Sequence, residues 1–152
     1  PTPPITLEQM QNFTAPMLSR NPSMHFVFAR MGMAEEQGLG LASLRNRARQ
    51  QNLPLPVFTW DDPYLVLTLY RSSKAAVETL DEGKLGALSK AERAGWEWLA
   101  TRESVTTAEY QEAMNLPNRT AKNHMKKFTD LGLLLMVGSG RATQYKVARN
   151  HQ

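Results

Sequence analysis

In the C-terminal third of the chain, apolar residues recur at helical spacing in two consecutive short segments. The first segment begins at Ser89, and the pattern Ser-x-x-Glu that Ser89 forms with Glu92 is a capping box, which is typical of a helix start. The second begins at Thr107 and ends at Asn115-Leu116-Pro117, because proline lacks an N–H group and disfavours helical geometry in the residue before it. The pattern therefore predicts two helices followed by a tight turn.

A third helix is predicted directly after this turn. We expect the side-chain oxygen of Asn118 to cap it and Gly132 to end it in a left-handed conformation. Its apolar residues are spaced by four, three and three positions, which places them on one buried stripe: Ala121, Met125, Phe128 and Leu131.

Two strands are predicted next, over residues 133–137 and 144–147. They flank Gly138-Ser139-Gly140-Arg141, and the glycines suit the tip of a hairpin because they accept positive φ. Three helices followed by a hairpin in this order are typical of a winged helix-turn-helix, which we expect over residues 88–150.

The polar side of the predicted third helix is basic. We expect base contacts from Arg119, Thr120 and Asn123, since a helix fits the major groove and its first turns meet base edges. Phosphate contacts are expected from Lys122, Lys126 and Lys127, and a wing contact from Arg141 at the hairpin tip. A merely solvated helix face would carry similar charges. The turn, the helix order and the hairpin together favour double-stranded DNA as the partner.

The charge distribution favours the same partner. The formal net charge is +4, and the first 87 residues carry eight basic and eight acidic side chains, so the excess lies in residues 88–152. Within that part, one acid, Asp130, accompanies the basic residues of the third helix, the hairpin and the tail. A module polarised in this way attracts a polyanion along one face.

The N-terminal half shows short helical patterns followed by a hairpin. Helices are expected near residues 6–10, 21–31 and 41–49, and strands at 57–60 and 64–71 flank the turn Asp61-Asp62-Pro63. In the second strand, leucines at 65, 67 and 69 alternate with the residues between them. The expected class is α+β, with a small helical and hairpin unit over residues 1–73, a linker over 74–87 that contains a helical turn or two, and the winged helix after it.

Three runs in this half resemble a known family: Asn21-Pro22, Met33-Ala34-Glu35-Glu36-Gln37-Gly38-Leu39-Gly40-Leu41 and Asn52-Leu53-Pro54-Leu55-Pro56-Val57-Phe58. They look like the C-terminal part of a domain similar to the RecG-type helicase C-terminus, which is distantly related to the GHKL ATPase fold. The resemblance covers roughly residues 1–71. In this family the domain typically follows a Schlafen-type AlbA domain in bacterial transcriptional regulators that end in a winged helix. The resemblance implies the C-terminal fragment of such a cytoplasmic regulator.

A nucleotide-binding remnant is the sharpest competing function. The run Gly38-Leu39-Gly40-Leu41 is similar to one that closes over nucleotide phosphates in GHKL ATPases, where glycine lets backbone N–H groups approach an anion. Two glycines are a weak signal, and the Lys-Ser/Thr pair of a phosphate loop does not follow them. We favour a helix entry and expect no cofactor.

The composition bears on metal binding, catalysis and membrane insertion. The 152 residues include no cysteine, and the three histidines are scattered, so a zinc site is not expected. Ser89 and Ser139 have structural explanations as a cap and a hairpin residue, so no nucleophile with a base emerges and we expect no enzyme. No apolar run approaches the ~20 residues of a membrane span.

An interaction module stays open as a third class of function. Methionines and phenylalanines make the N-terminal region apolar and adaptable: Met10, Met17, Met24, Met31, Met33, Phe13, Phe26 and Phe28. Ordinary core packing is the preferred interpretation of most of them. Self-association is the alternative, and a homodimer would suit the reading of paired DNA half-sites.

Overall fold

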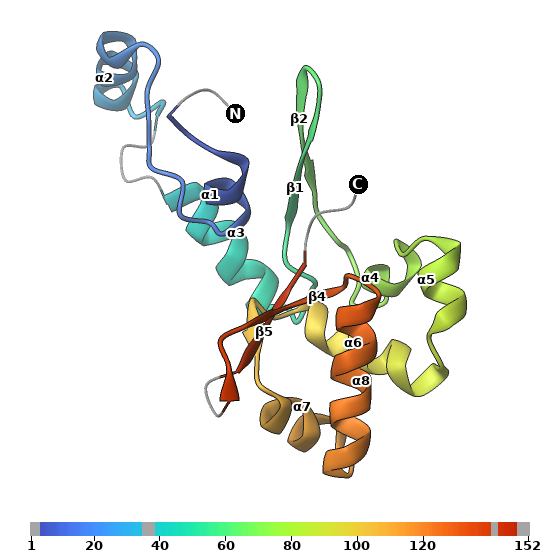
Figure 1. The fold of residues 1–152 in the computed structure, drawn as a ribbon. Coiled ribbons are helices and arrows are strands. Elements are labelled where there is room, and N and C mark those ends of the chain that lie inside the picture. The colour runs from blue at the N-terminus through green and yellow to red at the C-terminus, as the bar shows by residue number, and fades with distance from the viewer. Residues whose placement is uncertain (1–3, 35–38, 141–142, 149–152) are drawn as a thin grey trace.

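The computed structural model describes residues 4–34, 39–140 and 143–148, and its class is α+β as predicted (Figure 1). Short helices and a two-stranded hairpin form the N-terminal half, and a helical unit with a three-stranded sheet forms the C-terminal half. The N-terminal elements are α1 (Leu7–Gln11), α2 (Pro22–Arg30), α3 (Leu39–Gln50), β1 (Val57–Asp61) and β2 (Tyr64–Thr68). The C-terminal elements are α4 (Ala75–Glu78), α5 (Glu82–Ala87), α6 (Lys90–Ala100), β3 (Ser104–Val105), α7 (Thr107–Met114), α8 (Asn118–Asp130), β4 (Leu134–Val137) and β5 (Gln144–Val147).

The local signals for the C-terminal helices are confirmed in atomic detail. Glu92 N donates to Ser89 Oγ at 3.3 Å and Ser89 N donates to Glu92 Oε2 at 2.8 Å, which is the predicted capping box of α6. Helix α7 starts at Thr107 as predicted, behind a second capping box between Thr106 and Glu109. Gly132 follows α8 at φ 69°, so the left-handed stop is also confirmed.

The predicted cap of α8 is wrong. Pro117 occupies the N-cap position and Asn118 is already the first helical residue, with no side-chain cap hydrogen bond. Because side chains in a helix lean toward its N-terminus, the Asn118 amide reaches back to α7 instead. Its Nδ2 donates to Gln111 Oε1 at 2.9 Å, so Asn118 links the two helices across the turn.

One strand of the C-terminal sheet was not predicted. The order is β3-β5-β4, with β4 and β5 paired from Leu134↔Val147 to Val137↔Gln144, close to the predicted strand bounds. Strand β3 pairs through Ser104↔Lys146 and Val105↔Tyr145. Two residues are too few to show alternation in a sequence, so only pairing with β5 identifies this strand.

The hydrophobic core lies between α4, α6, α7, α8 and the start of β4. The predicted stripe of α8 supplies its centre, since Ala121, Met125 and Phe128 are fully buried and Leu131 packs against them partly buried. The remaining buried members of the cluster come from the neighbouring elements: Ala76, Leu80, Leu88, Trp96, Leu99, Ala100, Val105, Tyr110, Leu133 and Leu134.

Residues 74–87 are more than the expected linker. They form α4 and α5, and Ala76 and Leu80 belong to the buried core. The indole Nε1 of Trp96 donates to the carbonyl oxygen of Ala76 at 2.9 Å, which attaches α4 to α6. Asp81 and Glu82 lie on the exposed side of the segment, which is why its polar sequence indicates a linker although its apolar residues are packed.

Two sets of polar contacts join the two halves of the chain. Leu55 N donates to the Ala100 carbonyl at 3.1 Å, and Arg45 and Arg49 of α3 both lie in ion-pair range of Glu103, at 3.5 and 3.2 Å. Within the N-terminal half, Gln11 of α1 bridges the base of the hairpin, with Nε2 donating to Pro56 O and Oε1 accepting from Phe58 N. The end of α3 and the start of β1 are thereby fixed against the C-terminal unit.

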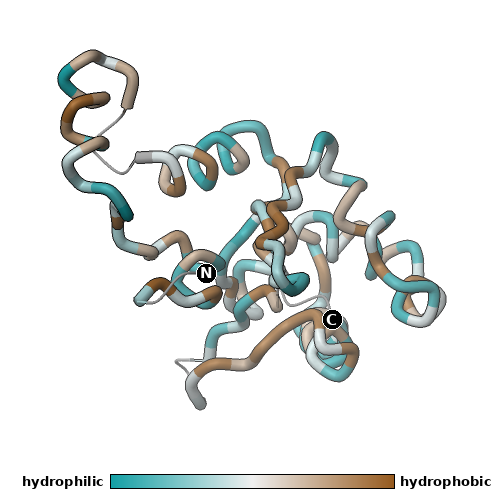
Figure 2. The backbone as a smooth tube through the Cα atoms, turned by 90° about the horizontal axis from the view of Figure 1, so that it is seen from above, coloured by the Kyte–Doolittle hydropathy of each residue, from teal (hydrophilic) through white to brown (hydrophobic). Residues whose placement is uncertain are grey.

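The outer part of the N-terminal half exposes its apolar residues, which contradicts the preferred interpretation of a core. Phe13 is buried against Phe58, but α2 and its flanks are exposed, and both views place α2 at the periphery (Figures 1 and 2). Exposure is 41–70% for Met17, Met24, Phe26, Phe28, Met31 and Met33. Strand β2 is exposed from Tyr64 to Leu67, so its alternating leucines do not define a buried face.

Candidate nucleic-acid interface

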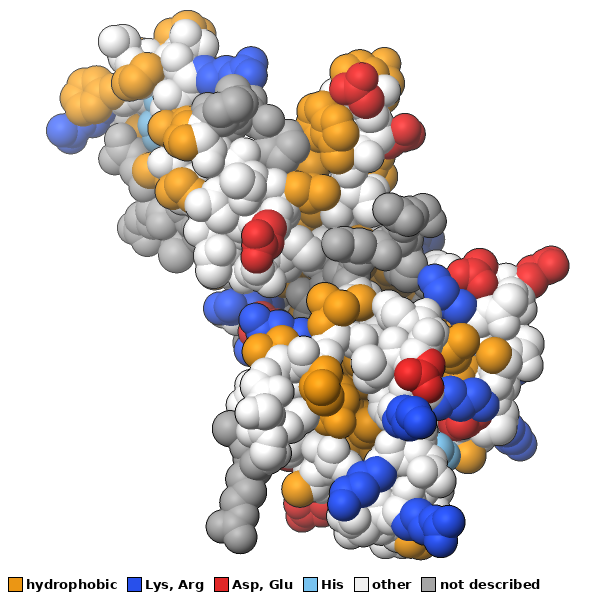
Figure 3. All heavy atoms as spheres, viewed as in Figure 1, with side chains coloured by type: hydrophobic (Ala, Val, Ile, Leu, Met, Phe, Trp, Pro, Cys, Tyr) orange, Lys and Arg blue, Asp and Glu red, His pale blue; other side chains and the backbone are white. Residues whose placement is uncertain are grey.

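The predicted contact residues of α8 divide into an exposed face and a flank. We use the name basic face for the four that are exposed at helical spacing on one side of α8: Arg119, Lys122, Asn123 and Lys126. Figure 3 shows lysine and arginine side chains gathered over the part of the surface where α8 lies. The buried stripe occupies the opposite side, so packing against the core turns the basic face to solvent.

Lys127 is not on the basic face. Its Nζ lies 2.7 Å from Glu92 Oε2, and the Glu92 side chain is only 10% exposed while that of Lys127 is 38% exposed. The lysine therefore pairs α8 with α6 instead of pointing freely to solvent. This ion pair makes Lys127 less available to a phosphate than the exposed Lys122 and Lys126 are.

The electrostatics of Glu92 fit this pairing. Burial raises the pKa of the Glu92 carboxyl, but hydrogen bonds from Lys127 and from the backbone and hydroxyl of Ser89 outweigh burial, so its pKa lies below the usual value. The same Oε2 atom accepts from Lys127 Nζ and from Ser89 N. One carboxylate thus caps α6 and anchors α8.

Thr120 and Arg141 are the two remaining predicted contact residues. Thr120 is half-buried, on the flank between the basic face and the stripe, and is less accessible than Arg119 and Asn123. Arg141 lies outside the described residues. Gly138 and Gly140 at the hairpin tip have φ of 84° and 62°, as predicted for positive-φ positions.

A buried polar pair holds α8 in position against α7. Tyr110 Oη lies 2.9 Å from His124 Nδ1; Tyr110 is fully buried and His124 is 8% exposed. Burial, with a smaller effect from the Glu92 charge, raises the pKa of the Tyr110 phenol far above its usual range, so the hydroxyl keeps its proton. Their rings pack edge-on or tilted against Phe128 and each other. His124 therefore has a packing role beside the stripe.

The β4–β5 hairpin presents an unexpected apolar surface. On β4, Leu135, Met136 and Val137 are 45–61% exposed, and on β5 Lys146 is exposed. Within the described residues of this hairpin, Lys146 is the one cation. Among the described residues of this unit, the basic face of α8 therefore gathers three of the five exposed cations.

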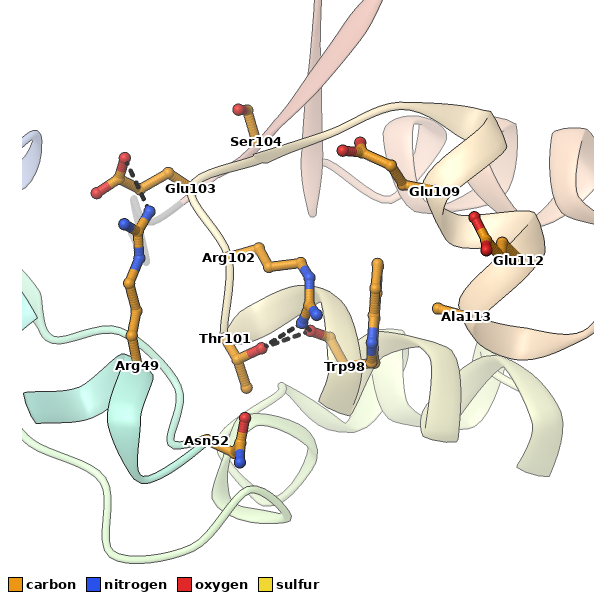
Figure 4. Close-up of a pocket in the computed structure, with 10 residues that line it drawn as sticks. All are labelled: Arg49, Asn52, Trp98, Thr101, Arg102, Glu103, Ser104, Glu109, Glu112 and Ala113. Carbon is orange, nitrogen blue, oxygen red and sulfur yellow. Dashed lines mark hydrogen bonds and ion pairs between the residues drawn. The ribbon is translucent and has the colours of Figure 1, made fainter. Parts of the chain in front are cut away.

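A cavity of about 630 Å³ lies between α3, the end of α6, β3 and α7 (Figure 4). The guanidinium of Arg102 points into it, 3.6 Å from the Trp98 ring, and donates to Trp98 O and Thr101 Oγ1 at 3.2 and 2.8 Å. Burial lowers the pKa of Arg102, and Glu109 opposes that shift. The cavity lining includes no histidine or cysteine, and Arg102 already has partners, so this space is a polar junction between the halves.

No group of three or more metal-ligating side chains occurs among the residues described. In the same residues, no helix is both long enough and apolar enough to cross a membrane.

Comparison with known families gives a partial match. Residues 1–69 match the sequence model of the family described as "Putative ATP-dependent DNA helicase recG C-terminal". Neither the search of curated proteins nor that of solved structures found a match. The matched segment covers α1 to α3 and the β1–β2 hairpin and ends before α4, so α8 lies outside it. The N-terminal half of this chain is similar to the RecG C-terminus, as its Asn-Pro and Leu-Pro-x-Pro runs predict.

Proposed function

We propose that the C-terminal unit, residues 88–150, is a winged helix-turn-helix that binds double-stranded DNA with α8 in the major groove. The observation that carries the proposal is the two-sided character of α8, whose basic face is exposed while its opposite stripe is fully buried in the core. With 13 residues the helix is about 20 Å long, which suits insertion into the groove.

The contacts follow from the position of each side chain on α8. Arg119 and Asn123 lie in the first two turns and are exposed, so they are the proposed base contacts. Lys122 and Lys126 flank them and are the proposed phosphate contacts. Thr120 has a secondary role because it is half-buried.

The wider context supports DNA as the partner. The segment similar to the RecG C-terminus, whose description names a DNA helicase, precedes the DNA-binding unit in this chain. We propose that the chain acts as the DNA-reading part of a bacterial cytoplasmic transcriptional regulator, without catalysing a reaction itself.

The test is the salt dependence of DNA binding. A fluorescent random-sequence duplex is titrated with the protein at about 50 and 200 mM salt, since each neutralised phosphate contributes about 0.9 to the slope of log affinity against log salt. We expect the variant Arg119→Ala/Lys122→Ala/Lys126→Ala to bind all duplexes more weakly and to lose about 2 from the slope, since two of its three cations are proposed phosphate contacts. Asn123→Ala should instead alter preference between sequences.

A variant with the same loss of charge elsewhere is the matched control. Arg30→Ala/Lys84→Ala/Arg47→Ala removes three cations from α2, α5 and α3, and it should keep the slope of the unmodified protein. If the two triple variants lost affinity equally, net charge and not the basic face would drive binding. If the basic-face variant bound normally, α8 would be abandoned as the docking surface.

A protein-interaction or dimerisation module is the second candidate function. The exposed apolar residues of α2 and of the β1–β2 hairpin favour it, because soluble monomers rarely expose large contiguous apolar patches. A module that binds only protein should show little affinity for the duplex and no salt slope.

A further inference from the structure

The amide side chains of Gln111 and Asn118 meet across the turn between α7 and α8. Asn118 Nδ2 donates to Gln111 Oε1 at 2.9 Å, and Asn118 is exposed while Gln111 is half-buried. Within the described part of the chain, this is the one hydrogen bond that either side chain makes. Both amides therefore keep donors and acceptors that the described residues leave unused.

The unused groups of Asn118 form a definite pattern. A side-chain amide has two N–H donors and one carbonyl oxygen acceptor. Gln111 takes one hydrogen of Asn118 Nδ2, so the second hydrogen and the Oδ1 oxygen remain. If both amides rotate, the hydrogen bond runs from Gln111 to Asn118, and Asn118 still keeps Nδ2 hydrogens and a lone pair of Oδ1. In either orientation Asn118 offers one donor next to one acceptor.

Asn118 also lies at the end of α8 that the proposed function inserts into the groove. It is the first residue of the helix and directly precedes Arg119 of the basic face. Lys122, four residues later, lies one turn further along nearly the same side of the helix. The first turns of a recognition helix meet base edges. The exposed Asn118 amide is therefore in the part of α8 that would reach the bases.

The chemistry of DNA favours one partner for this donor–acceptor pair. Phosphate oxygens only accept hydrogen bonds, so a phosphate would leave Oδ1 of Asn118 unpaired. In the major groove, guanine shows two acceptors, cytosine shows a donor, and thymine shows an acceptor beside a methyl group. Adenine shows the N7 acceptor beside the N6 amino donor. Adenine is the base that matches both groups.

We propose that Asn118 reads an adenine in the major groove, with Nδ2 donating to adenine N7 and Oδ1 accepting from the adenine N6 amino group. Gln111 is the positioning residue, since its hydrogen bond holds the Asn118 amide before DNA arrives. Holding a side chain in advance reduces the conformational entropy that binding would cost. The inference rests on the proposed function, because it requires α8 in the groove, and it adds a base contact to Arg119 and Asn123.

Selection of bound sequences from a library of randomised duplexes tests the contact. We expect the unmodified protein to prefer adenine at one position where Asn118→Ala has no preference. Asn123→Ala should keep this preference and change another. Replacing that A·T pair by another pair should weaken binding of the unmodified protein about 5- to 150-fold, the range for a bidentate contact. Asn118→Ala should bind both duplexes alike.

A modified base tests the atoms of the contact. 7-Deazaadenine pairs with thymine as adenine does but lacks the N7 acceptor. At the selected position it should weaken binding of the unmodified protein at least fivefold and leave the affinity of Asn118→Ala unchanged. An equal loss in both proteins would assign N7 to another residue and would overturn the proposal.

Variants of Gln111 test its positioning role. Gln111→Ala should reduce the adenine preference, but it should have no further effect on preference in the Asn118→Ala background. Gln111→Glu keeps an acceptor for Asn118 Nδ2, so it should keep the preference, although its negative charge weakens binding to all duplexes. If Gln111→Ala weakened all duplexes equally and kept the adenine preference, Gln111 would contact phosphate instead, and the positioning role would be overturned.

A matched control and a folding check complete the design. Asn46→Ala removes an exposed asparagine from α3 and should keep both affinity and preference. Far-ultraviolet circular dichroism verifies that each variant is folded. If DNA binding showed the salt slope of the basic face but the adenine preference survived in Asn118→Ala, this inference would be overturned while the proposed function stands. A protein without affinity for duplex DNA would overturn both.

Discussion

Replacing Lys127 by Ala removes the cation that pairs with Glu92 between α8 and α6, and we expect it to destabilise the fold. The Nζ–Oε2 distance is 2.7 Å and the Glu92 side chain is 10% exposed, so the variant leaves a largely buried carboxylate with only its Ser89 hydrogen bonds. Hydrogen bonds to charged groups contribute about 1.5–3 kcal/mol and exposed ion pairs about 0.2–1 kcal/mol. Because Lys127 is itself 38% exposed, we expect a loss of about 1–2 kcal/mol.

The assay is thermal unfolding followed by circular dichroism. A loss of this size should lower Tm by about 3–6 °C in a chain of this length. Lys126→Ala, the neighbouring exposed position on the basic face, is the control and should change stability by less than about 0.5 kcal/mol. In the DNA titration we expect the opposite ranking of the two variants: Lys126→Ala should weaken binding, while Lys127→Ala, measured below its Tm, should not.

The pH dependence gives an independent check. The folded-state pKa of Glu92 lies below the unfolded value near 4.5, so its interactions stabilise the protein above that value and lose their effect as the pH falls through the folded pKa. The difference in stability between the unmodified protein and Lys127→Ala should therefore shrink below pH 4.5. Equal Tm values at pH 7, or a difference that grows in acid, would refute the role assigned to this ion pair.

Three further substitutions test the packing of α7 and α8 and the cap of α7. Gly95→Ala should destabilise by about 1–2 kcal/mol, because the added Cβ would overlap the Tyr110 hydroxyl and lie 2.9 Å from Tyr110 Cζ; Gly86→Ala, with open space around it, should be neutral or stabilising in the same melts. Tyr110→Phe should cost about 1–2 kcal/mol by leaving His124 Nδ1 without its hydroxyl partner. Combined with Gly95→Ala it should cost less than the sum, and strict additivity in urea melts would contradict the overlap. Thr106→Ala should cost about 1 kcal/mol by removing the cap of α7, whereas an unchanged midpoint would show that the cap adds nothing.

The sequence by itself determined the features that depend on neighbours a few residues apart. The capping boxes at Ser89 and Thr106, the stop at Gly132 and the positive-φ glycines of the hairpin tip arise from contacts within one turn of chain. Ser89 and Gly132 were assigned from residue type and spacing alone. The stripe of α8 follows in the same way, because helical periodicity fixes which residues share a side. Three of its four residues are fully buried, and Leu131, at the end of the helix, is partly buried.

Only the tertiary structure decided which polar residues are available for binding. Lys126 and Lys127 are adjacent residues of the same type, but Glu92, 35 residues earlier in the chain, forms an ion pair with Lys127 while Lys126 is exposed. Asn118 similarly contacts α7 instead of capping α8. The packing of the helices determines these side-chain partners. The spacing of residues along the sequence does not show which residues of two helices come into contact.

The exposure of the N-terminal half was also decided by tertiary structure. Alternating leucines in β2 and phenylalanines in α2 are typical of residues that pack inward, yet burial requires a second layer to cover them. The core of the C-terminal unit recruits Ala76 and Leu80 from α4 and its flank, while β2 meets β1 on one side. Burial of a hydrophobic residue lowers the free energy of the protein. Only the arrangement of the whole chain determines whether a partner surface is there to bury that residue.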